Sequence, residues 1–204
     1  FPNFLRAHKN LGMIHFRKGR HAEAIKSLTR AVELGGADGT VLGILGLAYL
    51  NTERWLSAES AYRSALLLQP DVADWKLGLA RALFSQQKFG EVGALIDELI
   101  AQSPDRADYW LLQANAFIGM NQPMKAAQNY EMLIRMNKAT PEALNLLGDI
   151  YVNEKLYGLA ARAYVMAMDV APDKGLPAGV RAAEILAQRG ATAAAKEVAQ
   201  GLRD

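Results

Sequence analysis

Small residues recur at a fixed interval along this chain of 204 residues, and the interval never slips. One position of the repeat is always glycine or alanine, at Gly12, Gly46, Ala80, Ala114, Gly148 and Ala182. A second position, in the same frame, reads Ala24, Ala58, Val92, Ala126, Ala160 and Ala194. Each step is 34 residues long, as from Gly12 to Gly46. A period of this length is typical of arrays in which every unit is one supersecondary element stacked on the next.

The spacing of apolar residues inside one unit predicts a pair of helices. Leu42, Gly46 and Tyr49 follow one another at i, i+4 and i+7, so they form one stripe of a helix. Ala58 and Tyr62 are spaced i and i+4 and form the matching stripe of a second helix. The small residues let the two helix axes approach each other, and the large rings fill the space beside them.

These patterns predict five helix-pair repeats and a degenerate sixth pair within a single domain, 1–204. The repeats are expected at about 5–38, 39–72, 73–106, 107–140 and 141–174, with a capping pair at 175–204. Thr140, Pro141 and Glu142 form a favourable helix start, with a capping hydroxyl and a proline in the first turn. The last pair is rich in alanine and polar residues and carries Arg181 where most other units have leucine, so we expect it to shield the end of the array.

The slots resemble the tetratricopeptide repeat, whose pattern is W-x2-L-G-x2-Y…A-x3-F…P. The matching positions are Gly12, Gly46, Tyr49, Ala58, Pro70, Ala80, Pro104, Trp110, Ala126, Gly148, Tyr151, Ala160 and Pro172. Departures occur in single repeats, with Gln113 and Arg181 in place of Leu and Gly36 and Lys138 in place of Pro. The resemblance implies an all-α fold, a right-handed superhelical solenoid of antiparallel helix pairs, that acts as a non-catalytic protein-interaction scaffold or adaptor.

The resemblance also implies a concave groove lined by the first helix of each pair. Transferred by position, the lining residues are Lys9, Met13, Phe16, Gly43, Leu47, Leu50, Leu77, Arg81, Phe84, Leu111, Asn115, Ile118, Asn145, Asp149 and Val152. The centre of this stripe is apolar, with Arg81 and Asn115 as polar handles. We therefore expect a peptide or an amphipathic helix of a partner protein to bind there, with packing inside the array as the alternative for the apolar residues.

Members of the family that act as co-chaperones hold a carboxylate with a set of Lys, Asn and Arg residues. Lys9 and Asn10 match two positions of that set, but Met13 stands where an Asn should follow. Ile44 and Leu77 occupy further positions that should be polar. The chain is therefore not expected to be a receptor for chaperone tails.

The sequence offers no recognisable chemistry. It contains no cysteine, which excludes disulfides, thiolate metal sites and cysteine nucleophiles. Catalytic and phosphate-binding motifs such as HExxH, GxSxG and a glycine-rich phosphate loop do not occur. The histidines His8, His15 and His21 lie in the first repeat without a complementary ligand set, so packing or surface roles are expected. We predict no catalytic residue, no metal site and no cofactor.

Charge and hydropathy restrict the partners further. A net charge of +2 does not predict nucleic-acid binding, and no stretch is long and apolar enough to span a membrane. The first repeat is basic, which would suit an acidic partner, although a solvated face is the common explanation. Self-association into an assembly or envelope scaffold, RNA binding by related helical repeats and an unrecognised enzyme are the alternatives. The chain opens with Phe1, which suggests a processed piece, so bacterial cytoplasm, periplasm and cell envelope all stay open.

Overall fold

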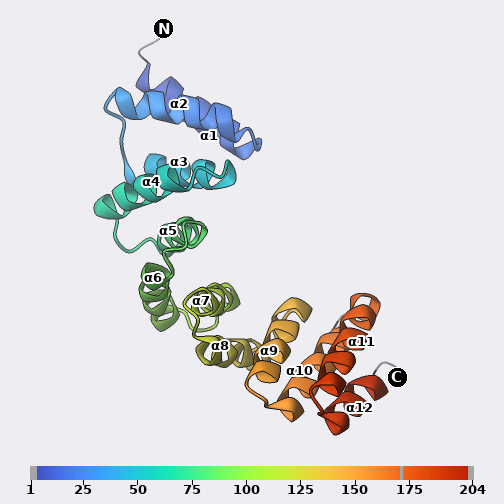
Figure 1. Cartoon of the computed structure of the whole chain (residues 1–204). Coiled ribbons are helices and arrows are strands. Elements are labelled where there is room, and N and C mark those ends of the chain that lie inside the picture. The colour runs from blue at the N-terminus through green and yellow to red at the C-terminus, as the bar shows by residue number, and fades with distance from the viewer. Residues whose placement is uncertain (1–3, 171, 202–204) are drawn as a thin grey trace. The chain divides into compact units, whose positions relative to one another are not determined.

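The computed structural model describes residues 4–170 and 172–201, and these residues form twelve α-helices without any strand (Figure 1). The helices are α1 Leu5–Arg17, α2 His21–Glu33, α3 Gly39–Asn51, α4 Trp55–Leu68, α5 Ala73–Ser85, α6 Phe89–Gln102, α7 Ala107–Gly119, α8 Pro123–Arg135, α9 Pro141–Asn153, α10 Tyr157–Val170, α11 Pro172–Gln188 and α12 Thr192–Gly201. Consecutive helices pack as pairs, from α1 with α2 to α11 with α12. The predicted all-α helical-repeat class is confirmed.

Helix boundaries follow the repeat frame closely, with one difference at the last pair. Thr140 caps α9, where its hydroxyl accepts a hydrogen bond of 3.2 Å from the Ala143 N–H, as the sequence predicts. Helix α11 begins at Pro172, three residues before the expected start at position 175. Proline is well suited to a first helical position because its missing N–H would have no partner there. Pro172 thus opens the last pair rather than closing the fifth repeat.

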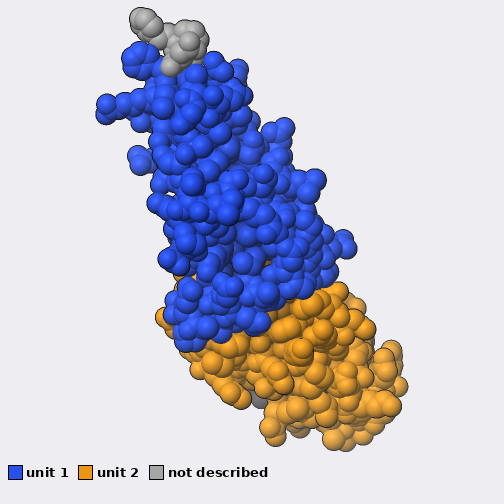
Figure 2. All heavy atoms as spheres, turned by 90° about the vertical axis from the view of Figure 1, so that its left-hand side faces the viewer, with its two compact units in different colours: residues 1–104 blue, residues 105–204 orange. Residues whose placement is uncertain are grey.

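The chain divides into two compact units, residues 1–104 and 105–204, which Figure 2 colours separately. The first unit contains α1 to α6 and the second contains α7 to α12. A single domain over 1–204 stays a prediction.

Close helix contact explains the invariant small position. A Cβ added at Gly46 would lie 3.0 Å from the Tyr62 ring, and one added at Gly148 would lie 2.5 Å from Cε1 of Tyr164. Ala80 occupies the same position in the third repeat and is completely buried. The larger the ring on the second helix and the closer its approach, the less room a side chain on the first helix has. The repeat frame is therefore set by packing distance.

The turn inside each of the first five helix pairs has a left-handed residue at the same position of the repeat. These residues, with φ between 55° and 70°, are Gly19, Glu53, Gln87, Asn121 and Lys155. The next N–H in the chain then reaches back to the first helix, as when Arg54 donates to the Tyr49 carbonyl at 2.9 Å. This backbone bond closes the end of the first helix and fixes the angle at which the second one starts.

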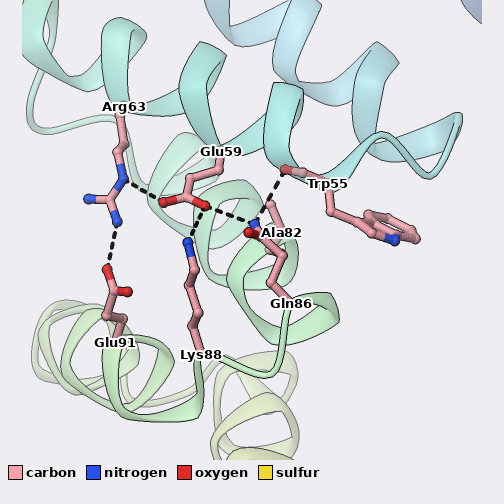
Figure 3. Close-up of polar contacts among 7 residues, drawn as sticks. All are labelled: Trp55, Glu59, Arg63, Ala82, Gln86, Lys88 and Glu91. Atoms are coloured by element: carbon pink, nitrogen blue, oxygen red, sulfur yellow. Dashed lines mark hydrogen bonds and ion pairs between the residues drawn. The ribbon is translucent and has the colours of Figure 1, made fainter.

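A polar cluster joins α4 to α5 and α6 within the first unit (Figure 3). The Glu59 carboxylate accepts hydrogen bonds from Lys88 Nζ at 2.8 Å, Gln86 Nε2 at 2.8 Å and Arg63 Nε at 3.0 Å. Arg63 also donates from a terminal nitrogen to Glu91 at 2.6 Å. Partial burial alone would raise the pKa of Glu59, but these hydrogen bonds outweigh it and lower the pKa to about 2. The cluster fastens the third repeat to the second.

Removing this carboxylate should weaken the first unit. We expect Glu59→Ala to lower the free energy of unfolding by about 1–2 kcal/mol near neutral pH, because Lys88 and Arg63 are partly solvated and lose only part of their interaction. The folded-state pKa is depressed from 4.5 to about 2. The contribution is therefore complete above pH 4.5 and is lost as the pH falls toward 2. Urea unfolding at neutral and acidic pH measures both effects.

Glu91→Ala is the matched control, since it removes only the ion pair with Arg63 from a side chain that is 51% exposed. It should change stability by less than about 1 kcal/mol. Equal losses for the Glu59 and Glu91 variants, or a Glu59 effect that persists unchanged at low pH, would contradict the assignment.

Candidate partner-binding surface

In the first unit, the predicted groove positions divide into accessible and buried side chains. Arg81 is exposed and Leu47 is 37% exposed, while Leu50 and Phe84 are half-buried. Leu77 is only 6% exposed and belongs to the core. Positions i and i+7 of a helix differ in direction by only about 20°, so the burial of Leu77 reflects what packs over it and not its place in the stripe.

Two further positions of the stripe are also buried. A Cβ at Gly43 would clash with Nε1 of Trp75, so the indole ring covers this position. Val152, in the second unit, is 4% exposed. Leu77, Gly43 and Val152 are therefore packing residues rather than surface available to a partner, which corrects the expectation for these three positions.

The first repeat uses its groove positions mainly for internal contacts. Lys9 forms an ion pair with Asp38, the capping residue of α3, so its ammonium group is already neutralised within the chain. Met13 and Phe16 are half-buried, and the Phe16 ring lies 5.4 Å from the ring of His21. This end of the stripe offers a partner less free polar surface than the sequence suggests.

In the second unit, tyrosines of the second helices hold the polar groove residues in place. Tyr130 donates its hydroxyl proton to Oδ1 of Asn115 at 2.9 Å, and Tyr164 donates to Oδ1 of Asp149 at 2.7 Å. Burial raises the pKa of Tyr130 to about 12, and burial together with the Asp149 carboxylate raises the pKa of Tyr164 above its usual range. Both hydroxyls therefore stay protonated donors near neutral pH.

Leu111, Ile118 and Asn145 complete the predicted positions of the second unit. Ile118 is 41% exposed, whereas Leu111 and Asn145 are half-buried. Leu111 packs at the edge of the core of the second unit. These side chains present a mixed apolar and amide surface next to the two tyrosine-anchored residues.

A small polar hollow of about 200 Å³ lies between α9, α10 and α11. It is lined by Asn145, Asp149, Tyr164, Arg181, Ala182 and Ile185. Asn145 and Asp149 are predicted groove residues, whereas the sequence marks Arg181 only as a departure from the repeat. The signal that could have found Arg181 was that departure, a cation in a position that holds leucine in the other repeats except for Gln113. The hollow offers a cation, a carboxylate and an amide, a combination suited to binding a polar group.

The remaining features bear on chemistry and on membranes. Among residues 4–170 and 172–201, no three His, Cys, Asp or Glu side chains come together as a metal site would require. Within the same residues, no helix combines the length and the apolarity needed to cross a bilayer.

Three models of the tetratricopeptide repeat match the chain, over residues 5–37, 49–116 and 111–172. The human protein O-mannosyl-transferase TMTC1 is 22% identical over 169 residues, covering 81% of this chain and 19% of that protein. The Arabidopsis thaliana protein SULFUR DEFICIENCY-INDUCED 1 is 38% identical over 60 residues, which are 29% of this chain and 19% of that protein. The chain thus spans about a fifth of the length of these curated relatives.

Solved structures agree on the fold. MamA from Desulfovibrio magneticus RS-1 is 18% identical, with a TM-score of 0.76 over 83% of this chain and 96% of that one. PilF of Pseudomonas aeruginosa is 20% identical, with a TM-score of 0.70 over 94% of this chain and 88% of that one. Helical repeats of this kind generally form scaffolds for protein interaction. From the repeat frame, the helix pairs and the matches that run from residue 5 to residue 172, the chain belongs to the tetratricopeptide repeat family.

Proposed function

We propose that this chain is a non-catalytic adaptor that binds a peptide or helix of a partner protein along the first helices of its repeats. No cofactor takes part in this role. The observation that carries the proposal is the hollow that Arg181 lines together with Asn145 and Asp149, two of the predicted groove positions.

Preorganisation supports a binding role for this surface. Asn115 and Asp149 occupy the same position of successive repeats and each accepts a hydrogen bond from a buried tyrosine. A side chain already fixed in one orientation loses little conformational entropy when it binds a partner. Each residue retains a second acceptor or donor group that can pair with the polar groups of a peptide.

The first unit contributes apolar contact area. Leu47 and Leu50 on α3 are partly exposed, as is Phe84 on α5, whose ring lies 5.3 Å from the ring of Phe89. Burying such side chains against a partner is favourable by about 25 cal/mol per Å² of apolar surface. Arg81 on α5 supplies a charge that can fix the register of the partner.

The proposal is tested with the double variant Arg81→Glu, Leu111→Asp, which reverses one charge and places a carboxylate in the apolar stripe. Leu67→Asp is the matched control, because Leu67 lies on the second helix α4 and is 85% exposed. Partners retained from a native lysate by the wild type should be lost with the double variant and kept with the control. Circular dichroism should show unchanged helicity for all three proteins.

Equal recovery of the same proteins by the double variant would move the binding site off the first helices. Recovery lost with both variants would point to the second-helix side of the repeats instead.

A further inference from the structure

The polar hollow between α9, α10 and α11 contains an arginine that the repeat pattern does not call for. In the other repeats the same position is occupied by Leu11, Leu45, Leu79, Gln113 and Leu147. Leu147 is 1% exposed and belongs to the core, whereas Arg181 is exposed and lines the hollow. The last repeat thus places a cation beside two of the predicted groove positions.

The guanidinium group of Arg181 is available to a ligand. Among residues 4–170 and 172–201, no side chain or carbonyl forms a hydrogen bond or an ion pair with it. A guanidinium group offers several N–H donors in one plane and accepts no hydrogen bond. Asp149 lines the same hollow without forming an ion pair with Arg181. The hollow therefore holds a cation and a carboxylate that are not satisfied by each other.

The carboxylate of Asp149 is held in a fixed orientation. The hydroxyl of Tyr164, a residue that is 3% exposed, donates to Oδ1 of Asp149 at 2.7 Å. Oδ2 receives no hydrogen bond from the part of the chain that the structure describes. Asn145, one turn earlier on α9, adds a half-buried amide that can donate or accept. Donors on α11 thus lie across the hollow from acceptors on α9.

These charges restrict the chemistry of the ligand. A carboxylate would pair with Arg181 but would be repelled by Asp149, and an ammonium group would meet the reverse conflict. A carboxamide avoids both conflicts, because its carbonyl oxygen accepts from the guanidinium group and its NH₂ group donates to the carboxylate. A hydroxyl has both functions on one oxygen atom with a single proton, so it serves the two charges less fully.

The size and the apolar walls of the hollow also suit a carboxamide side chain. Its volume is about 200 Å³. One water molecule occupies about 30 Å³ of the liquid, so there is room for a carboxamide together with its methylene groups. Ala182 is 2% exposed and Ile185 is half-buried, and both line the hollow. They offer the methylene groups an apolar contact.

We propose that this hollow binds the side-chain carboxamide of a glutamine or an asparagine in the partner protein. Arg181 donates to the carboxamide oxygen, and Asp149 accepts from the carboxamide nitrogen. The inference rests on the proposed function, since it names the side chain that the hollow selects from the bound segment. Its residues differ from Arg81 and Leu111, so the two proposals can fail separately.

NMR titration of the isotope-labelled full chain tests the inference with defined probes. The probes are N-acetylglutamine methylamide and its glutamate, lysine and alanine analogues, which share one backbone and differ only in the side chain. Ligands of this size bind in the millimolar range. The glutamine probe should shift the amide signals of Asn145, Ala182 and Ile185 in a saturable way. The other probes should bind at least about fivefold more weakly.

Two variants separate recognition from a structural role. Asp149→Asn keeps an oxygen that can accept from Tyr164 but removes the charge, so the preference for the glutamine over the glutamate probe should fall at least about fivefold. Arg181→Leu carries the residue of most other repeats and should abolish the saturable shifts. Arg162→Leu is the matched control, because Arg162 is an exposed arginine on α10 that does not line the hollow.

Equal affinity for all probes, or a preference that Asp149→Asn leaves unchanged, would overturn the inference without touching the lysate experiment on Arg81 and Leu111. Tighter binding of free glutamine than of the capped probe would assign the hollow to a small amino-acid ligand and also overturn it. Selective shifts combined with equal recovery in the lysate experiment would reject the groove and keep the carboxamide site.

Discussion

Replacing Gly148 with leucine is expected to lower the free energy of unfolding by about 1–3 kcal/mol, which is the usual cost of overpacking a filled contact. A Cβ at this position would lie 2.5 Å from Cε1 and 2.7 Å from Cζ of Tyr164, before any further leucine atom is placed. The ring cannot simply turn away, because Tyr164 is 3% exposed and its hydroxyl is bonded to Asp149. Helices α9 and α10 must therefore separate. Thermal or urea unfolding followed by circular dichroism measures the change.

Gly158→Ala is the control for this experiment. Gly158 lies in the first turn of α10, and nothing stands within 4 Å of the Cβ that alanine would add. Alanine has the higher helix propensity, so stability should stay equal or rise by up to about 1 kcal/mol. A Gly148→Leu variant as stable as the wild type would show that the two helices do not meet at this position.

The helix pairs were predictable because two closely packed helices require a small residue at their contact, and such residues are visible in the sequence. A Cβ at Gly46 would lie 3.0 Å from the Tyr62 ring and one at Gly148 would lie 2.5 Å from the Tyr164 ring, so these contacts favour a small residue at this position. Helix ends were predictable almost as well, as the Thr140 cap shows. The start of α11 differs from the prediction because the repeat pattern places Pro172 at the end of a unit, although proline is equally suited to a first turn.

The left-handed turns inside the helix pairs could not be predicted from the residue type. Gly19 marks its left-handed turn in the usual way, but Glu53, Gln87 and Lys155 adopt the same conformation at the same position. Residues with a Cβ are strained there, by about 1–2 kcal/mol for a left-handed backbone. The conformation is imposed by the backbone hydrogen bond that runs from the residue after the turn back to the first helix, as from Arg54 to Tyr49, and by the packing of the two helices. The residue type alone therefore could not reveal it.

The candidate surface was predictable by position only in part. Repeat position selected Asn145 and Asp149, which line one hollow, but it also selected Leu77, which is buried. Burial depends on how far each repeat is rotated against its neighbour, and no single repeat encodes that rotation.

Truncating Tyr164 to alanine should lower the free energy of unfolding by about 3–5 kcal/mol, the range for removing a buried aromatic side chain. The ring is 3% exposed and lies in the core of the second unit with Leu147 and Leu186. Tyr164→Phe keeps the ring and loses only the hydrogen bond to Asp149, which is exposed and can bind water instead, so it should cost about 1 kcal/mol. Urea unfolding of the three proteins gives both differences.

Gly148→Leu and Tyr164→Ala should not act independently, because both change the contact between residue 148 and the ring of Tyr164. In the Tyr164→Ala background the ring that opposes residue 148 is gone, so the leucine of Gly148→Leu can occupy the vacated space. We therefore expect Gly148→Leu to cost at least about 1 kcal/mol less in that background than in the wild type, a coupling typical of residues in direct contact. Additive losses would mean that the two positions do not touch. A favourable coupling would show that Gly148 leaves room for the ring of Tyr164. The same ring carries the hydroxyl that orients Asp149 at the candidate surface.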